Sequence, residues 1–334
     1  MELKLVKINE VPPKLLDRID KFILSENTNG EFINSLKYLS YHPNGRFQKD
    51  SVVVLDEGSK EIQAVMFVTV NSKDALHIVS HMGTTFAGPI LNSKVGIKQN
   101  IEIMDLILEY YEEKYNRIEI RVRPSVYDDQ PMDFISYYLL QKGYSVGMMA
   151  LANVIKLSSI SDIEAQLKLY DSKRRNHIKK ALKEERYIVK KEVNINEAAW
   201  NNMEYNLCEK FGSHTTHSYE EIQKLITLCP ENILPRYTER YDGNYGAFAL
   251  VYKFKNVYHT QYLDVNYALS AEYPHLFLIH NLIKEAREQG FSYFSFGAST
   301  EERGEYLNEG LYNYKNGYGG GSVILPVYTK VLSK

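Results

Sequence analysis

The sequence predicts an α/β (α+β) protein of two tandem domains, each with a mixed, mostly antiparallel, twisted sheet flanked by helices. The chain of 334 residues is long enough for two domains, since single domains typically run ~100–200 residues. The order strand, strand, helix, strand occurs once in each half. The composition, 44% hydrophobic and 25% charged, is that of a globular protein, which excludes a disordered or fibrous chain.

The first repeat lies in the N-terminal half. Ser51–Leu55 and Glu61–Val70 are rich in Val, Ile and Phe and are predicted to pair as strands around a short polar turn. Apolar residues then recur with helical spacing from Ile101 to Tyr111, which predicts an amphipathic helix. Arg117–Arg123 alternates polar and apolar residues, as a half-buried strand does.

The second repeat has the same elements. Tyr245–Lys253 and Val257–Val265 are predicted to form a strand pair, and a helix is predicted from His275 to Gln289. Gly290 follows at the position where a left-handed helix cap belongs. Phe291–Phe296 is the predicted closing strand.

Two helices between the repeats have readable ends. Ser161 with Glu164, and Ser218 with Glu221, have the spacing of a capping box, and Pro230 ends the second helix.

The domain boundary has to come from the repeat, because the chain has no linker rich in Pro, Gly or Ser. Met148–Leu157 is strand-like and lies between the two repeats. We therefore expect an N-terminal domain at residues 1–155 and a C-terminal domain at residues 156–334.

Charge and cysteine content exclude several classes of protein. A net charge of −2 gives no general attraction to nucleic acid or anionic membranes. Cys208 and Cys229 lack CxxC spacing, so neither a metal site nor a disulfide framework is expected. The apolar runs are far shorter than the ~20 residues of a membrane helix, so no membrane insertion is expected. The N-terminus does not read as a signal peptide, which predicts a cytoplasmic protein.

A basic segment opens the second half of the chain. Asp171–Lys183 reads as a capped helix start with six Lys or Arg residues. A helix N-terminus with this charge density suits phosphate, which makes Lys173, Arg174 and Arg175 candidate ligand-binding residues. The alternative is a solvated basic face.

A glycine-rich segment follows the predicted closing strand. Phe294–Thr300 runs into Gly, Ser and Thr, and Gly310–Gly320 reads as a loop of aromatic residues and glycines around one lysine. Such a loop permits close approach of the backbone to a ligand.

These segments resemble the FemAB/FemX peptidoglycan bridge-forming transferases of the GNAT acyltransferase superfamily. The resemblance rests on Ser172–Ala181, Ser295–Ser299, Leu311–Gly320 and, in the first half, Ser80–Pro89. It implies two tandem GNAT-like domains. It also implies transfer of an acyl or aminoacyl group from an activated carrier to an amine, commonly on a cell-envelope precursor.

Two departures from the superfamily concern the donor. Acetyl-CoA enzymes hold the pyrophosphate in a glycine-rich turn that opens a helix, whereas this chain has Ala271–Leu276 there. The segment from Phe211 to Tyr245 is too short for the helical arm that some family members associate with tRNA. No tightly bound cofactor is expected, and acyl-CoA and aminoacyl-tRNA both remain open as donor co-substrates.

Three residues are candidates for the chemistry. By the resemblance, Lys315 matches a lysine at the reaction centre, where a cation can stabilise the oxyanion or the departing oxygen; the alternative is a surface loop lysine. His259 can accept the amine proton, or it is a satisfied core histidine. Asp264 can act as a base or anchor the acceptor amine, or it caps a helix or strand end. Tyr258 and Tyr262 are expected on the opposite face from His259.

The remaining candidates bind substrate. Arg121 and Arg123 share one strand face and can hold phosphates or a carboxylate in an interdomain cleft, unless they face solvent. Thr85 belongs to a loop that can contact the acceptor. Tyr312 offers a flat surface for a sugar or nucleobase, and Ser299 lies where the closing strand ends.

The leading hypothesis is therefore an acyltransferase acting on a phosphorylated small-molecule or envelope-precursor acceptor, such as a nucleotide sugar or muropeptide, with tRNA as one possible donor. The alternatives are a CoA-dependent N-acyltransferase on an amino sugar or small metabolite, and a non-catalytic ligand-binding homologue. Nucleic-acid binding by the basic helix has weak support from one short cluster. The transferred group and the oligomeric state stay open.

Overall fold

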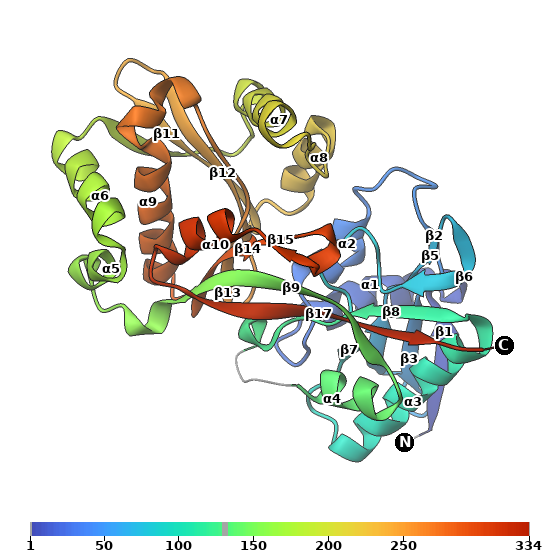
Figure 1. The fold of residues 1–334 in the computed structure, drawn as a ribbon. Coiled ribbons are helices and arrows are strands. Elements are labelled where there is room, and N and C mark those ends of the chain that lie inside the picture. Colours follow the sequence, from blue (N-terminus) through green and yellow to red (C-terminus); the bar gives the residue numbers. More distant parts are fainter. Residues whose placement is uncertain (1, 129–132, 334) are drawn as a thin grey trace. The chain divides into compact units, whose positions relative to one another are not determined.

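The computed structural model describes residues 2–128 and 133–333 (Figure 1). The chain forms two compact units. Unit 1 comprises Met1–Ala150, Arg303–Glu305 and Ile324–Lys334, and unit 2 comprises Leu151–Glu302 and Tyr306–Val323. The first division lies close to the predicted one. The prediction had kept the end of the chain in the second domain, whereas the structure assigns it to unit 1.

Unit 1 contains two groups of paired strands. One has the order β1-β3-β4-β7, and the other has the order β17-β8-β6-β5-β2. The strands are β1 (Leu3–Lys7), β2 (Gln48–Lys49), β3 (Val52–Asp56), β4 (Ile62–Met66), β5 (Thr69–Asn71), β6 (Asp74–Val79), β7 (Ile90–Leu91), β8 (Arg117–Arg121) and β17 (Gly321–Val331, of which Ile324 onward lies in unit 1). The helices are α1 (Pro13–Ile23), α2 (Leu36–Leu39), α3 (Ile97–Lys114) and α4 (Phe134–Gln141).

Most predicted elements of the first repeat are confirmed, but the strand predicted over Glu61–Val70 is two strands, β4 and β5, in different groups, and the strand predicted over Arg117–Arg123 ends at Arg121. β3 pairs with β4 in antiparallel fashion, and α3 and β8 follow as expected. The apolar stripe of α3 packs into a core with the inward residues of β3, β4 and β8. Ile101 is more exposed than predicted, and Ile103 takes a buried place instead.

β17 belongs to unit 1 because of its pairing with β8. Val327 to Val331 run antiparallel to Arg121 to Arg117. The residues of β17 alternate only partly, so neither its partner nor its domain is evident from the sequence.

Unit 2 has one sheet with the order β10-β11-β12-β13-β14-β9. Its strands are β9 (Ser145–Lys156, of which Leu151 onward lies in unit 2), β10 (Tyr187–Lys191), β11 (Ile233–Arg240), β12 (Tyr245–Lys253), β13 (Val257–Val265) and β14 (Tyr293–Ala298), with a small pair β15 (Thr300–Glu301) and β16 (Tyr306–Leu307). Among the described strands of unit 2, β13 and β14 pair in parallel and the other neighbours pair antiparallel, which confirms a mixed, mostly antiparallel sheet.

Helices cover both faces of the unit 2 sheet. They are α5 (Ile163–Leu169), α6 (Ser172–Glu184), α7 (Glu197–Phe211), α8 (Tyr219–Leu228), α9 (Pro274–Glu288) and α10 (Glu309–Asn316). α6 and α9 lie on one face, and α7 and α8 lie on the other (Figure 1). The apolar stripe of α9 packs on Ala247, Ala249 and Val251 of β12. Because the side chains of the two alanines are small, the helix can lie close to the sheet.

Some predicted helix ends are confirmed and others are wrong. Ser218 and Glu221 form the predicted capping box of α8, and Gly290 has the predicted left-handed conformation, with φ +83°. Ser161 does not cap α5: its hydroxyl donates to Asp162, and Asp162 is the cap. The first part of the predicted glycine-rich loop, Gly310–Gly320, is in fact helix α10, which begins after Asn308 and ends at Asn316, whereas Gly317–Gly319 form a turn.

A β-bulge changes the face of Tyr262. Leu250 of β12 pairs with Tyr262 of β13, but the next residue, Val251, pairs with Thr260, so that Gln261 has no partner in the register. Tyr252 then pairs with His259. Since residues two apart on β12 share a face, Tyr262 shares a face with His259, contrary to the prediction. Tyr258 remains on the α9 face, as predicted.

Candidate functional site

The site lies in unit 2, where β13 and β14 stop pairing. The parallel ladder joins only Val257–His259 to Tyr293–Ser295, although β13 continues to Val265. β14 also has an irregular register with β9 between Ser295 and Gly297, and Gly297 has φ +71°. A bulge with glycine in the left-handed region redirects the following peptide groups. The carbonyls of Gly297 and Ala298 lie beyond the end of the parallel ladder with β13.

Lys315 occupies the space that these carbonyls face. It lies in the last turn of α10 and is buried. Its Nζ donates to the carbonyl oxygen of Ala298 at 2.5 Å and to that of Gly297 at 3.3 Å. Among the described residues it forms no ion pair, and burial lowers the pKa of its amine to about 8. A buried lysine that titrates near neutral pH is a typical functional-site group.

His259 borders the same glycine. Its Nδ1 lies 3.1 Å from the hydroxyl of Ser295, and its Cε1 lies 3.2 Å from the place where a side chain at Gly297 would begin. Burial, and after it the charge of Lys315, lowers the pKa of His259 to about 4. The imidazole is therefore neutral at pH 7, and the structure brings two of the predicted catalytic residues together.

The third predicted catalytic residue, Asp264, has a different environment. Its carboxylate accepts hydrogen bonds from Nδ2 of Asn202 at 2.6 Å, from Nδ2 of Asn206 at 2.9 Å and from the hydroxyl of Tyr245 at 2.9 Å. The two asparagines come from α7, so the carboxylate fastens this helix to the sheet. Both oxygens already have donors, which favours a structural role.

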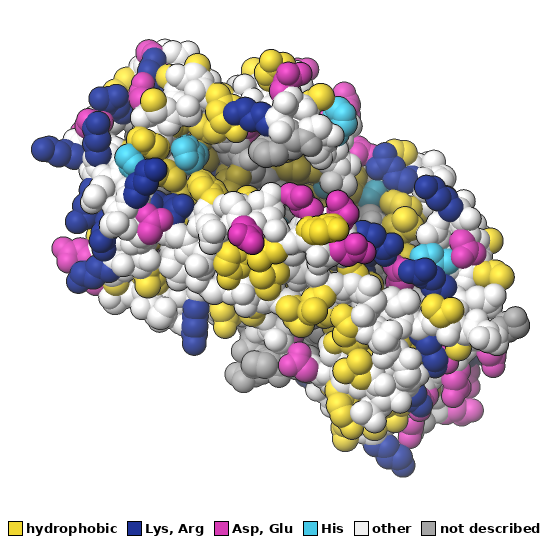
Figure 2. All heavy atoms as spheres, viewed as in Figure 1, with side chains coloured by type: hydrophobic (Ala, Val, Ile, Leu, Met, Phe, Trp, Pro, Cys, Tyr) yellow, Lys and Arg dark blue, Asp and Glu magenta, His cyan; other side chains and the backbone are white. Residues whose placement is uncertain are grey.

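The basic residues at the start of helix α6 lie in two different environments. Arg174 is buried: its guanidinium donates to Asp171 at 2.6 Å and to the carbonyl oxygen of Tyr314 at 2.8 Å, and it lies 4.2 Å from the ring centre of Tyr318. It thus connects α6 to α10. Lys173 is exposed and Arg175 is half-buried. Figure 2 shows Lys and Arg side chains on the outer side of α6, at the left of the view.

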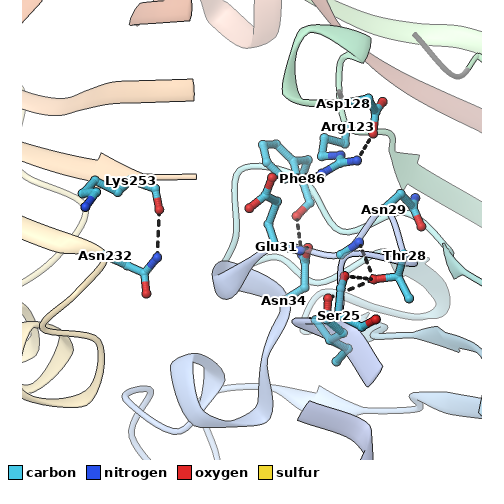
Figure 3. Close-up of polar contacts among 12 residues, drawn as sticks. Ser25, Thr28, Asn29, Glu31, Asn34, Phe86, Arg123, Asp128, Asn232 and Lys253 are labelled. Carbon is cyan, nitrogen blue, oxygen red and sulfur yellow. Dashed lines mark hydrogen bonds and ion pairs between the residues drawn. The ribbon is translucent and has the colours of Figure 1, made fainter. Parts of the chain in front are cut away.

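The predicted residues of unit 1 contact other parts of unit 1. Arg121 donates to the carbonyl oxygen of Thr84 at 3.2 Å. The side chain of Arg123 is 7% exposed and forms ion pairs with Asp128 and with Glu31, the latter at 2.9 Å (Figure 3). The anions that Arg123 binds in this structure are therefore carboxylates of the protein itself.

Three further predicted residues have clear positions. Thr85 is exposed, and Tyr312 is half-buried on α10. Ser299 is fully buried: its hydroxyl donates to Oδ1 of Asn153 at 2.7 Å and its backbone N–H to Leu151 at 2.7 Å. Ser299 thus fixes the end of β14 and does not face solvent.

The start of α9 has few free donors for a pyrophosphate. Pro274 has no N–H, and the N–H groups of Leu276 and Phe277 donate to the carbonyl oxygen of Tyr273. The ring of His177 stacks on that of Tyr273 with the centres 3.8 Å apart. Phosphate binding at a helix start needs several free backbone N–H groups, so this turn is poorly suited to it.

Two groups of the site were not found from the sequence. Ser295 contacts His259, and Gly317 lies so close to Arg174 that a Cβ there would be 1.7 Å from Nη1. In the sequence, these two groups could have been found from two glycines: Gly297 follows Ser295 by two residues, and Gly317 follows Lys315 by two residues.

Other possible sites lie elsewhere or do not form. A cavity of about 390 Å³ in unit 2 is lined by residues that include Asn196, Tyr237 and Tyr245, and it does not include His259 or Lys315. Within residues 2–128 and 133–333, no three His, Cys, Asp or Glu side chains are grouped to hold a metal ion. None of the described helices combines the length and apolar character needed to cross a bilayer.

Comparison with known proteins bears on the same half of the chain. Residues 209–316, which include His259 and Lys315, match the family model described as an acetyltransferase (GNAT) domain. No curated protein matches the chain in sequence.

Several solved structures share the fold over nearly the whole chain. FemX is 13% identical, with a TM-score of 0.68 over 99% of this chain and 98% of that one. A tandem GNAT protein from the clavulanic acid biosynthesis pathway is 9% identical, with a TM-score of 0.57 over 100% and 99%. L-PGS from Bacillus licheniformis is 12% identical, with a TM-score of 0.54 over 95% and 91%. At such identities the likeness shows the fold, and it confirms two tandem GNAT-like domains.

Proposed function

We propose that this protein, an acyltransferase with a GNAT domain and the fold of FemX, moves an acyl or aminoacyl group from an activated carrier to an amine on a phosphorylated cell-envelope precursor. The observation that carries the proposal is the placement of Lys315. Its amine is buried between the carbonyls of Gly297 and Ala298, beside a neutral His259. A buried lysine without a carboxylate partner costs stability, which is understandable if it serves chemistry.

Lys315 and His259 together offer what acyl transfer to an amine requires. The amine nitrogen attacks the carbonyl carbon, negative charge develops on the carbonyl oxygen, and the nitrogen must lose a proton. One group has to donate a hydrogen bond to the oxygen, and another has to accept the proton. No covalent nucleophile is needed for this reaction.

The start of α9 supports a donor other than acyl-CoA. Its first turn has Pro274 and two N–H groups already bonded to Tyr273, so a CoA pyrophosphate would find few partners there. The exposed lysines of α6 suit a more extended anion. We therefore place aminoacyl-tRNA first among the donors, with acyl-CoA as the alternative.

The acceptor follows from the resemblance of the motifs in α6, β14 and α10 to the FemAB/FemX group. A nucleotide-linked amino sugar and a nucleotide-linked muropeptide each carry both phosphate and an amine. Lys173 and Arg175 at the start of α6 are the cations that remain available for the phosphates, because Arg174 is engaged with Asp171 and Tyr314.

A turnover panel tests the proposal. Wild type and Lys315→Ala are incubated with charged tRNA or acyl-CoA donors and with nucleotide-linked sugar or muropeptide acceptors, and amide products are measured by mass spectrometry. Lys73→Ala, an exposed lysine in unit 1, is the matched control. We expect product with charged tRNA and an envelope precursor, lost in Lys315→Ala and kept in Lys73→Ala.

Two other results would replace the proposal. Turnover with acyl-CoA and a small amine would make the protein a CoA-dependent N-acyltransferase. Saturable binding of a precursor without turnover by any donor would make it a non-catalytic ligand-binding homologue.

A further inference from the structure

Among the residues that the structure describes, the hydroxyl of Ser295 has two hydrogen-bonding neighbours. It is 2% exposed and accepts a hydrogen bond from the backbone N–H of Gly297 at 3.2 Å. The other neighbour is Nδ1 of His259 at 3.1 Å. Because Gly297 is a donor, Nδ1 is the acceptor available to the hydroxyl proton of Ser295.

This arrangement decides where the neutral imidazole carries its proton. If Nδ1 were protonated, the hydroxyl would receive two N–H groups and its own proton would be buried without an acceptor, which is unfavourable. If Nδ1 is unprotonated, all three groups are satisfied. A neutral imidazole has one N–H, so the proton then lies on Nε2.

The other groups around the ring leave this assignment unchanged. The side chain of Gln261 raises the pKa of His259, against the larger lowering effect of burial. The ring of Phe254 lies 6.0 Å away, centre to centre, and Tyr252 is the cross-strand neighbour. Lys315 of α10 is the charged group that acts on His259, and its charge disfavours an imidazolium.

The contacts of Lys315 are compatible with the uncharged as well as the charged form of its amine, because both forms have at least two N–H groups. A neutral amine has two N–H groups and one lone pair, whereas an ammonium has three N–H groups and no lone pair. Two carbonyl oxygens, those of Gly297 and Ala298, accept from Nζ. With both N–H groups engaged, the lone pair of a neutral amine is left to accept a proton.

We propose that His259 donates a hydrogen bond from Nε2 to the oxyanion, that Lys315 accepts the proton of the attacking amine, and that Ser295 is the positioning residue that fixes the tautomer of His259. The proposal rests on the proposed function and assigns roles within that site. It reverses the roles expected from the sequence, where the lysine was the cation and the histidine was the base.

The reaction balances with these roles. The amine nitrogen forms a bond to the carbonyl carbon, and the carbonyl electron pair moves to the oxygen, which receives the hydrogen bond from Nε2. The nitrogen passes its proton to Nζ of Lys315. The electron pair on the oxyanion then re-forms the carbonyl double bond as the bond from carbon to the carrier breaks. The carrier oxygen or sulfur leaves with the electron pair of that bond, and Nζ returns the proton to it. An amide and the free carrier result, and Lys315 is neutral again.

Nitrogen NMR of the full-length protein tests the tautomer without any substrate. The histidine rings are labelled with ¹⁵N, and the signal of His259 among the nine histidines is identified by its loss in His259→Gln. We expect a protonated Nε2 and an unprotonated Nδ1, unchanged between pH 6 and 8. Ser295→Ala should give a mixture of tautomers. A protonated Nδ1 in the wild type would overturn the proposal.

Kinetics of two matched variants tests the roles. His259→Gln keeps a side-chain N–H donor but cannot act as a base, so we expect activity within about tenfold of wild type. His259→Leu, which has no donor, should lose about 100-fold or more. Lys315→Arg keeps the positive charge but stays protonated at all working pH values, so we expect a loss of at least about 100-fold. Wild-type-like activity of Lys315→Arg, or a His259→Gln variant as inactive as His259→Leu, would contradict the proposal.

Failure of this proposal is distinguishable from failure of the proposed function. If no donor gives turnover in the wild type, the function is wrong, and the NMR result still decides the tautomer. If turnover is present and the proton lies on Nδ1, the function stands and the role assignment is wrong.

Discussion

Nη2 of Arg174 donates to the carbonyl oxygen of Tyr314 at 2.8 Å, one residue before Lys315. The neighbouring N–H of Asp171 donates to the carbonyl oxygen of Gly317 at 2.9 Å, so the start of α6 contacts α10 on both sides of the lysine. α6 therefore supports the helix that carries the proposed proton acceptor. A basic residue that the sequence offered as a phosphate ligand is, in the structure, a support for the site.

Arg174→Ala should destabilise the protein by about 2–3 kcal/mol, because it removes buried charge-assisted hydrogen bonds to Asp171 and Tyr314. The measurement is the free energy of unfolding in urea. Arg175→Ala is the matched control, since Arg175 is the half-buried neighbour on the same turn, and it should change stability by no more than about 0.5 kcal/mol. Equal effects of the two substitutions would show that Arg174 is not the link between α6 and α10.

Gly317→Ala should be more harmful than its size suggests. The new Cβ would lie 1.7 Å from Nη1 of Arg174 and 2.5 Å from Oδ2 of Asp171, so the pair must move. We expect a loss of about 2 kcal/mol or more of unfolding free energy together with reduced turnover. Gly310→Ala is the control in the same helix, because its Cβ would find its nearest atom at 3.6 Å. It should gain about 0.5–1 kcal/mol, as alanine favours a helix over glycine.

Turnover should rise with pH through the titration of Lys315. The acceptor of the amine proton must be unprotonated, and burial lowers the pKa of Lys315 to about 8. The rate at low substrate should therefore increase from pH 6.5 to about pH 8 and then level off. His259, with its pKa near 4, does not titrate in this interval. A falling limb between pH 6.5 and 8 would instead indicate that Lys315 acts as a cation.

Asp264→Asn should reduce stability more than catalysis. The carboxylate accepts hydrogen bonds from two asparagine amides and a tyrosine hydroxyl. In Asp264→Asn, the side-chain NH₂ group would replace one carboxylate oxygen, and a donor would then point at another donor. We expect a loss of about 1–3 kcal/mol from one unsatisfied contact. Turnover at a temperature where the variant is folded should change by less than about threefold. A loss of 100-fold or more in a folded variant would restore Asp264 as a catalytic residue.

The repeated elements were predictable because they depend on local patterns. Alternation in Arg117–Arg123 and helical spacing in α3 and α9 follow from which face of each element meets the core, and the structure confirms them. The face of Tyr262 was not predictable, because a bulge at Gln261 shifts the alternation by one residue and has no composition signal.

The site was predictable in part: the sequence indicated which residues belong to it, but not which residues they contact. Lys315 and His259 were expected, and the structure brings both to Gly297. The sequence could not show that Arg123 meets Glu31 or that Arg174 meets Tyr314, since these contacts join segments far apart in the chain. Helix α10 was mistaken for a loop because its glycines suggested one, although Asn308 caps it.

The pairing of β17 with β8 sets an order for folding during synthesis. Strand β8 leaves the ribosome early and remains without one neighbour until β17 has been made, after all of unit 2. Translation at roughly 5–20 residues per second leaves that edge open for many seconds. The unit that begins first is thus the last to be completed, and in the meantime β8 is an open edge at which a chaperone or an intermolecular strand can pair.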